Sequence, residues 1–119
     1  MLLCLDIGNT NIVMGITNLN KIIEKYRFAT NTLITEDEYA VKFIECIKGS
    51  NYNIKDIDGV IISSVVPALD IIMKRAFEKY FGITPMYVVP GIKNGMNIKI
   101  ENPKQLGSDL LVGAVAAYN

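Results

Sequence analysis

The residues best suited to chemistry are the six consecutive residues Asp6-Ile7-Gly8-Asn9-Thr10-Asn11. They lie between two apolar runs, residues 2–5 and 12–16, and this pattern predicts a strand, a tight polar turn and a second strand. The turn offers a carboxylate, a hydroxyl and two amides, and its glycine lets the backbone come close to a ligand. A carboxylate suits Mg²⁺, and turn N–H groups can bind an anion. The segment is therefore either a phosphate and Mg²⁺ site or an ordinary hairpin turn, which favours the same residues.

Two further segments carry candidate groups. Gly107-Ser108-Asp109 opens a predicted helix, where Asp109 could accept a proton from a substrate hydroxyl. The alternative is that Ser108 or Asp109 is an ordinary N-cap. The polar loop 91–97 is either part of a substrate pocket or a plain connection.

The composition indicates one domain of 119 residues without a nucleic-acid footprint, because twelve basic residues balance twelve acidic ones. No Lys/Arg run predicts membrane binding, and no apolar run approaches the roughly 20 residues of a membrane-spanning helix. Asp6 interrupts the first apolar run, which argues against a signal peptide and favours a cytoplasmic protein. The chain has no histidine. We interpret Cys4 and Cys46 as reduced core thiols.

The periodicity predicts a mixed α/β fold with element order β-β-β-α-β-α-β-α. Thr35 and Glu38 form a capping-box pattern for the first helix, for which Gly49 is the expected C-terminal cap. Pro67 suits the first turn of the second helix, and Gly82 ends it. The expected strands are 2–7, 12–17, 22–28, 59–64 and 85–89, followed by a loop over 90–106 and a helix from Ser108 or Asp109.

At five places in order, the chain resembles the N-terminal half of the type III pantothenate kinases. These places are Asp6-x-Gly8-Asn9-Thr10 with Gly15, Arg27-x-x-Thr30, Thr35-x-Asp37-Glu38-Tyr39, Ile62-Ser63-Ser64-Val65-Val66-Pro67, and a last segment that combines Pro90-Gly91-Ile92-Lys93, Asn102-Pro103 and Gly107-x-Asp109. The resemblance implies an actin-like ATPase (ribonuclease H-like) domain with a five-stranded mixed sheet and helices on its faces. Residues 1–119 would be the N-terminal domain of a two-domain kinase whose C-terminal domain is absent from this chain.

The resemblance also implies the activity, which is ATP-dependent phosphorylation of pantothenate, the first step of coenzyme A biosynthesis. The residues implied to surround the ATP phosphates and Mg²⁺ are Asp6, Ile7, Gly8, Asn9, Thr10, Asn11, Ile12 and Val13, with Asp6 as the metal ligand. Asp109 would be the proton acceptor, and Ile100, Gly107, Ser108, Asp109 and Leu110 would contact pantothenate. A monovalent cation (K⁺ or NH₄⁺) and a homodimer are also implied.

Three positions depart from the family pattern. Leu110 replaces the usual Arg and removes a cation with five donors, Ile100 replaces a frequent Tyr, and Asn94 replaces a Thr. We expect residues 1–119 alone to bind ATP weakly and to turn over little. The alternatives are a non-catalytic regulator or interaction module of the same fold, and another small-molecule kinase of the superfamily.

Overall fold

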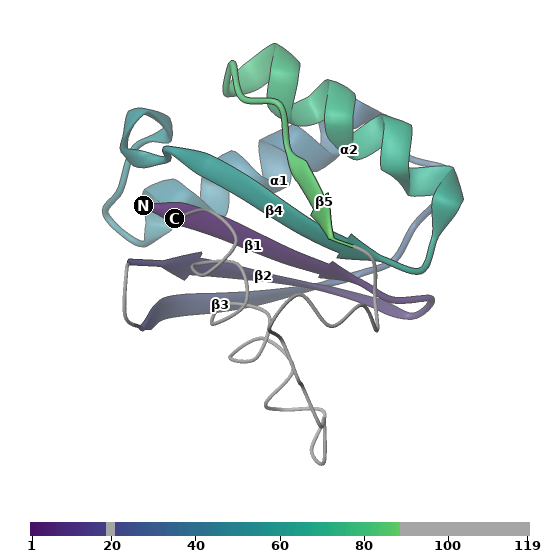
Figure 1. The fold of residues 1–119 in the computed structure, drawn as a ribbon, viewed down its shortest axis with the longest axis horizontal. Helices are drawn as coiled ribbons and strands as arrows, with labels where there is room; N and C mark the ends of the chain where they lie inside the picture. Colours follow the sequence, from purple (N-terminus) through teal and green to yellow (C-terminus); the bar gives the residue numbers. More distant parts are fainter. Residues whose placement is uncertain (19–20, 89–119) are drawn as a thin grey trace.

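The computed structural model describes residues 1–18 and 21–88. Its elements follow the predicted order, with one additional 3₁₀ turn before the fourth strand (Figure 1). They are β1 (Leu2–Ile7), β2 (Asn11–Thr17), β3 (Ile22–Ala29), α1 (Glu36–Gly49), η1 (Ile54–Asp56), β4 (Gly59–Ser64), α2 (Pro67–Tyr80) and β5 (Met86–Val88). The expected loop over 90–106 and the helix from Ser108 or Asp109 lie outside the described residues.

The five strands form one mixed sheet in the order β3-β2-β1-β4-β5 (Figure 1). β1 pairs antiparallel with β2 and parallel with β4, so it lies at the centre of the sheet. β2 pairs antiparallel with β3, and β4 pairs parallel with β5. The carboxyl ends of β1, β4 and β5 therefore meet at one edge, which is where ligands bind in open α/β sheets.

The hydrophobic core lies between the sheet and the two helices α1 and α2. Alternate strand residues face it, because successive strand side chains point to opposite faces. From the sheet these are Leu3, Leu5, Ile7, Ile12, Met14, Ile16, Val60 and Ile62, and from the helices they include Tyr39, Phe43, Ile47, Leu69, Met73 and Phe77. Both described helices thus cover one face of the sheet, and neither is long and apolar enough to cross a membrane.

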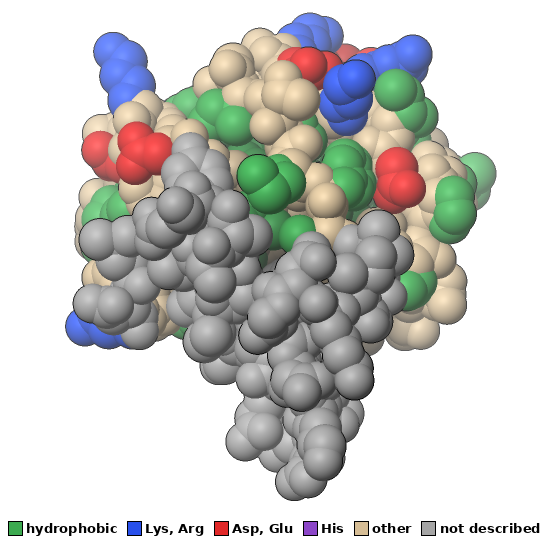
Figure 2. Space-filling view, viewed as in Figure 1, with side chains coloured by type: hydrophobic (Ala, Val, Ile, Leu, Met, Phe, Trp, Pro, Cys, Tyr) green, Lys and Arg blue, Asp and Glu red, His purple; other side chains and the backbone are tan. Residues whose placement is uncertain are grey.

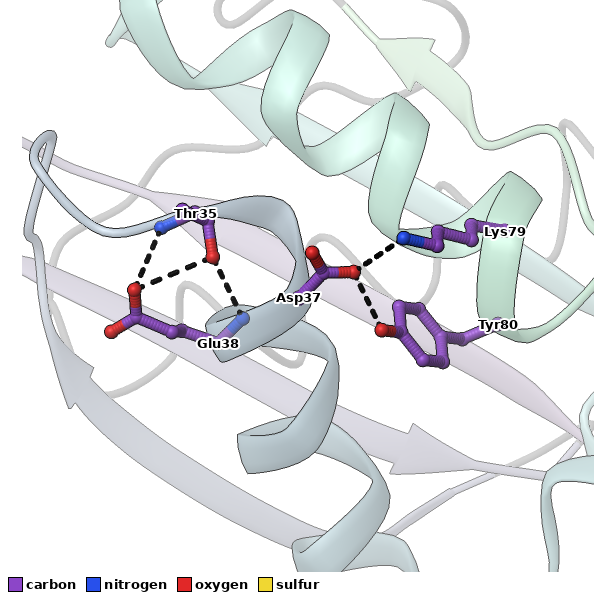
Figure 3. A network of polar contacts seen from close by, with 5 residues as sticks. All are labelled: Thr35, Asp37, Glu38, Lys79 and Tyr80. Carbon is purple, nitrogen blue, oxygen red and sulfur yellow. Dashed lines mark hydrogen bonds and ion pairs between the residues drawn. The ribbon is translucent and has the colours of Figure 1, made fainter.

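The predicted cap at the start of α1 is confirmed (Figure 3). The Thr35 hydroxyl accepts from the Glu38 N–H at 3.3 Å, and the Glu38 carboxylate accepts from the Thr35 N–H at 3.3 Å. The helix end differs from the prediction, since α1 runs through Gly49 to a C-cap at Ser50, and Asn51 takes the left-handed conformation with φ 66°. Asn tolerates that region better than most residues, so it serves where glycine was expected. Pro67 at the first turn of α2 and Gly82 after its end, with φ 67°, are as predicted.

Asp37 connects the two helices on the outside of the core (Figure 3). Its Oδ1 atom accepts from Lys79 Nζ at 2.8 Å and from the Tyr80 hydroxyl at 2.5 Å. These two hydrogen bonds lower the pKa of the Asp37 carboxyl group, and the bond from Lys79 has the larger effect. Because the Lys79–Asp37 pair is largely exposed to solvent, it should add little to the free energy of unfolding.

Phe43 is the centre of the aromatic packing in the core. Its ring stacks on Phe77 with centroids 5.5 Å apart and meets Phe28 edge-on, also at 5.5 Å. We expect Phe43→Ala to lower the free energy of unfolding by about 3–5 kcal/mol, measured by chemical denaturation. Val41→Ala on the exposed side of the same helix should change it by less than about 0.5 kcal/mol. Equal effects of the two substitutions would contradict this description of the core.

Candidate phosphate and metal site

The predicted turn is the tip of the β1–β2 hairpin, at the carboxyl end of the central strand. Gly8 donates its N–H to the Asn11 carbonyl at 2.9 Å and so closes the turn. A Cβ atom on residue 8 would lie 3.3 Å from that same carbonyl oxygen, which is closer than most side chains approach. Asn9 and Thr10 are exposed, and their N–H groups find no acceptor among the described residues. The turn therefore has backbone donors available to a ligand.

Two other segments meet the same end of β1. Thr30, just after β3, donates its hydroxyl to the Gly8 carbonyl at 2.6 Å and its N–H to the Thr10 carbonyl at 2.9 Å. Val65, just after β4, donates its N–H to the Ile7 carbonyl at 3.0 Å. The turn is thus supported from both sides, which favours a single conformation over a flexible loop.

Asp6 has the properties expected of a metal ligand. It lies on the face of the sheet opposite the aliphatic core, in register with Val13 on β2 and Ser63 on β4. Burial raises the pKa of its carboxyl group, and the described residues supply no hydrogen bond or ion pair to offset that cost. A bound cation would offset it. Mg²⁺ is commonly held by one or two carboxylates together with phosphate oxygens and water, so a single carboxylate at this position fits that ion.

A small hollow beside Asp6 is too small for a nucleotide. It has a volume of about 10 Å³, roughly one water molecule, and is lined by Cys4, Asp6, Val13, Gly15, Thr17, Ile22 and Lys25. Burial raises the pKa of the Cys4 thiol to about 11, so this cysteine is not a nucleophile at neutral pH. A nucleotide would have to lie beyond the carboxyl edge, where the exposed turn is.

The structure separates the predicted phosphate-site residues by role. Asp6 and Val13 share the face away from the core, whereas the side chains of Ile7 and Ile12 are buried in the core and leave only backbone atoms for a ligand. Gly15 lies within β2 opposite Cys4, several residues from the turn, so it does not take part in it. The predicted residues Ile100, Gly107, Ser108, Asp109 and Leu110 lie outside the described residues.

Two further residues join this site without having been assigned to it from the sequence. Ser63 is the neighbour of Asp6 on the adjacent parallel strand, and Thr30 contacts the turn directly. Both occur in the motifs that carry the family resemblance, which was the available signal. Their contacts depend on strand order and register, which those motifs do not specify.

The fold resembles that of two solved sugar kinases. The ROK hexokinase from Thermus thermophilus superposes with a TM-score of 0.55 at 14% identity, covering 74% of this chain and 34% of that chain. The putative N-acetylglucosamine kinase from Porphyromonas gingivalis gives a TM-score of 0.55 at 16% identity, covering 75% and 34%. At such identities the likeness shows the fold alone.

Sequence comparison identifies the family. The sequence model of the type III pantothenate kinases matches residues 2–119, and the chain belongs to that family. A curated type III pantothenate kinase from Halalkalibacterium halodurans is 44% identical over 117 residues. The aligned region covers 98% of this chain and 46% of that protein, so the chain spans about half the length of this relative.

Gly8→Ala tests whether the turn requires a residue without a side chain next to the Asn11 carbonyl. The added Cβ would press on the Asn11 carbonyl, so we expect the free energy of unfolding to fall by about 1 kcal/mol and Mg·ATP affinity to fall with it. Gly15→Ala is the matched control, because its Cβ would meet no atom closer than 3.8 Å and should be tolerated. Denaturation and calorimetric titration of the full-length protein measure both effects. A tolerated Gly8→Ala with unchanged affinity would show that the turn does not need glycine.

Asp6→Asn tests the metal ligand. We expect Mg·ATP affinity to fall at least about tenfold, to the level that the unaltered protein shows in EDTA.

Asp6→Asn should also raise the melting temperature of the nucleotide-free protein at neutral pH, because it removes a charge that burial disfavours. Burial raises the pKa of Asp6 in the folded protein. As the pH falls through this pKa, Asp6 becomes neutral in the unaltered protein, and the difference in melting temperature between the two proteins should shrink. Calorimetry and thermal denaturation measure the two effects, and an Asp6→Asn protein with unchanged affinity in Mg²⁺ would exclude this role.

Proposed function

We propose that the protein is a pantothenate kinase that transfers the γ-phosphoryl group of ATP to pantothenate, in the cytoplasm, as the first step of coenzyme A biosynthesis. The observation that carries this proposal is that a half-buried carboxylate, Asp6, which has no partner among the described residues, precedes a turn with exposed N–H groups at Asn9 and Thr10. Family membership supports the choice of pantothenate as acceptor.

The described residues would act by positioning and electrostatics, which supply most of the catalysis in phosphoryl transfer. Asp6 would hold Mg²⁺, which neutralises charge on the phosphates when it is bound. Gly8 to Asn11 would contact the phosphates through backbone N–H groups, and the segment from Asp6 to Val13 would line that end of the site. The buried side chains of Ile7 and Ile12 hold the turn on the sheet.

The acceptor side is assigned from the family pattern. Asp109 would accept the proton of the pantothenate hydroxyl, and Gly107 to Leu110 with Ile100 would contact the rest of that substrate. We further propose that residues 1–119 form the N-terminal domain of a two-domain kinase, that the kinase is a homodimer, and that K⁺ or NH₄⁺ assists it. Leu110, which stands where the family usually has Arg, leaves the pantothenate carboxylate to other donors.

ADP formation by the full-length protein tests the proposal. With Mg²⁺ and K⁺ present, we expect turnover that requires pantothenate and disappears with an analogue whose primary hydroxyl is replaced by hydrogen. Glucose and N-acetylglucosamine are the matched alternative acceptors, since sugar kinases share the fold. Turnover with a sugar and none with pantothenate would overturn the assignment, and a specific protein partner without any turnover would favour a regulator.

Asp109→Asn in the same protein tests the proton acceptor. Removal of a general base typically costs about 100-fold or more in rate, so we expect phosphorylation to become undetectable or nearly so. Folding and Mg·ATP affinity, followed by circular dichroism and calorimetry, should stay unchanged. Unchanged turnover would reject Asp109 as the base.

A further inference from the structure

We propose that Thr30 is the positioning residue of the phosphate-binding turn. By engaging the carbonyl groups of the turn, it would leave the turn with N–H donors as the groups that a phosphate meets. The inference rests on the proposed function and adds a residue that does not itself touch the phosphate.

Counting the polar groups of the turn supports this role. Three of its carbonyls are occupied: Gly8 by the Thr30 hydroxyl at 2.6 Å, Thr10 by the Thr30 N–H at 2.9 Å, and Asn11 by the Gly8 N–H at 2.9 Å. Two of these three bonds come from Thr30. The N–H groups of Asn9 and Thr10 have no acceptor in the described part of the chain.

The difference between bonded carbonyls and N–H groups without an acceptor in the described part has an electrostatic consequence. A carbonyl oxygen carries partial negative charge and repels a phosphate, whereas successive N–H groups form a concavity that attracts one. The Thr30 hydroxyl holds the Gly8 carbonyl and so fixes the peptide unit that carries the Asn9 N–H, with that N–H on the side opposite to the oxygen. The bond from the Thr30 N–H to the Thr10 carbonyl likewise keeps that second oxygen directed towards Thr30. A turn without these bonds could expose carbonyl groups to a phosphate.

The position of Thr30 is itself fixed by the core. The next residue, Asn31, donates its N–H to the Tyr39 hydroxyl at 2.9 Å, and its carbonyl accepts from that hydroxyl at 2.6 Å. Tyr39 belongs to α1, and its side chain has no exposed surface. On the other side, Ala29 is paired in register with Asn11 at the end of β3. Thr30 therefore lies between two anchored neighbours and can impose its geometry on the turn.

Thr30→Val is the direct test, because valine keeps the shape of threonine and removes only the hydroxyl. Loss of one such hydrogen bond predicts a rise of about five- to tenfold in the KM for ATP, with the KM for pantothenate unchanged within about twofold. Thr30→Ser restores a hydroxyl and should recover most of the ATP affinity. Thr32→Val is the matched control in the same loop, since the described residues give its side chain no hydrogen bond.

Mg·ATP titration of the same full-length proteins by calorimetry gives a second measure that needs no turnover. A Thr30→Val protein with unchanged Mg·ATP affinity overturns the inference, even if pantothenate is phosphorylated as proposed. A parallel rise in both KM values, or a loss that Thr30→Ser does not recover, also overturns it, because that pattern indicates general destabilisation. If pantothenate is not a substrate but Thr30→Val still weakens Mg·ATP binding, the proposed function fails and the role of Thr30 stands.

Discussion

The site depends on one constraint, which is that β1 is paired along both of its edges. Its backbone groups alternate between β2 on one side and β4 on the other, from Leu2 to Ile7. A strand held on both sides cannot slide without breaking two ladders, so its carboxyl end is a fixed point. The β1–β2 turn, Thr30 after β3 and Val65 after β4 all bond near this point. On the face that Figure 2 shows, most charged side chains of the described residues lie towards the top and left of the view, and hydrophobic side chains lie near its centre.

The same pairing decides which side of the sheet Asp6 occupies. Leu3, Leu5 and Ile7 are buried against the helices, and the side-chain period of two places Asp6 on the other face. A slip of one residue would bring the carboxylate into the aliphatic core and would remove three large apolar side chains from it. Burial of these apolar residues therefore positions the carboxylate. The raised pKa of Asp6 is the remaining cost, of a kind that proteins retain at functional sites.

Local signals in the sequence were enough to predict the elements. The apolar runs of the first two strands, the Thr35 and Glu38 cap, Pro67 and Gly82 each act within a few residues, and the elements that they predict were confirmed. The end of α1 was misplaced by two residues, because Asn51 and not Gly49 takes the left-handed conformation. The hairpin turn that follows Asp6 was predictable for the same local reasons, and its role as a phosphate and metal site stays a prediction.

The contribution of Thr30 could not be predicted in this way, because it depends on register. The pairing of β2 with β3 contains an irregularity between Ile16 and Thr17, where the register shifts. This shift decides which residue of β3 lies opposite Asn11 at the hairpin tip, and so places Thr30 next to the turn. No turn or capping signal near Thr30 indicates that shift. Ser63 likewise comes next to Asp6 only because β4 pairs with β1, a long-range contact across the first helix.

The two sides of the proposed reaction differ in how tolerant they are of sequence change. A phosphate held by backbone N–H groups needs the shape of a turn and only a few residues that allow that shape. The fold itself is shared with proteins that are only 14% and 16% identical. An acceptor must be recognised by side chains, and there each replacement removes a particular contact. This is why the proposal of pantothenate as substrate rests on family membership and not on the fold. Leu110, where the family usually has Arg, accordingly belongs to the proposed acceptor side of the reaction.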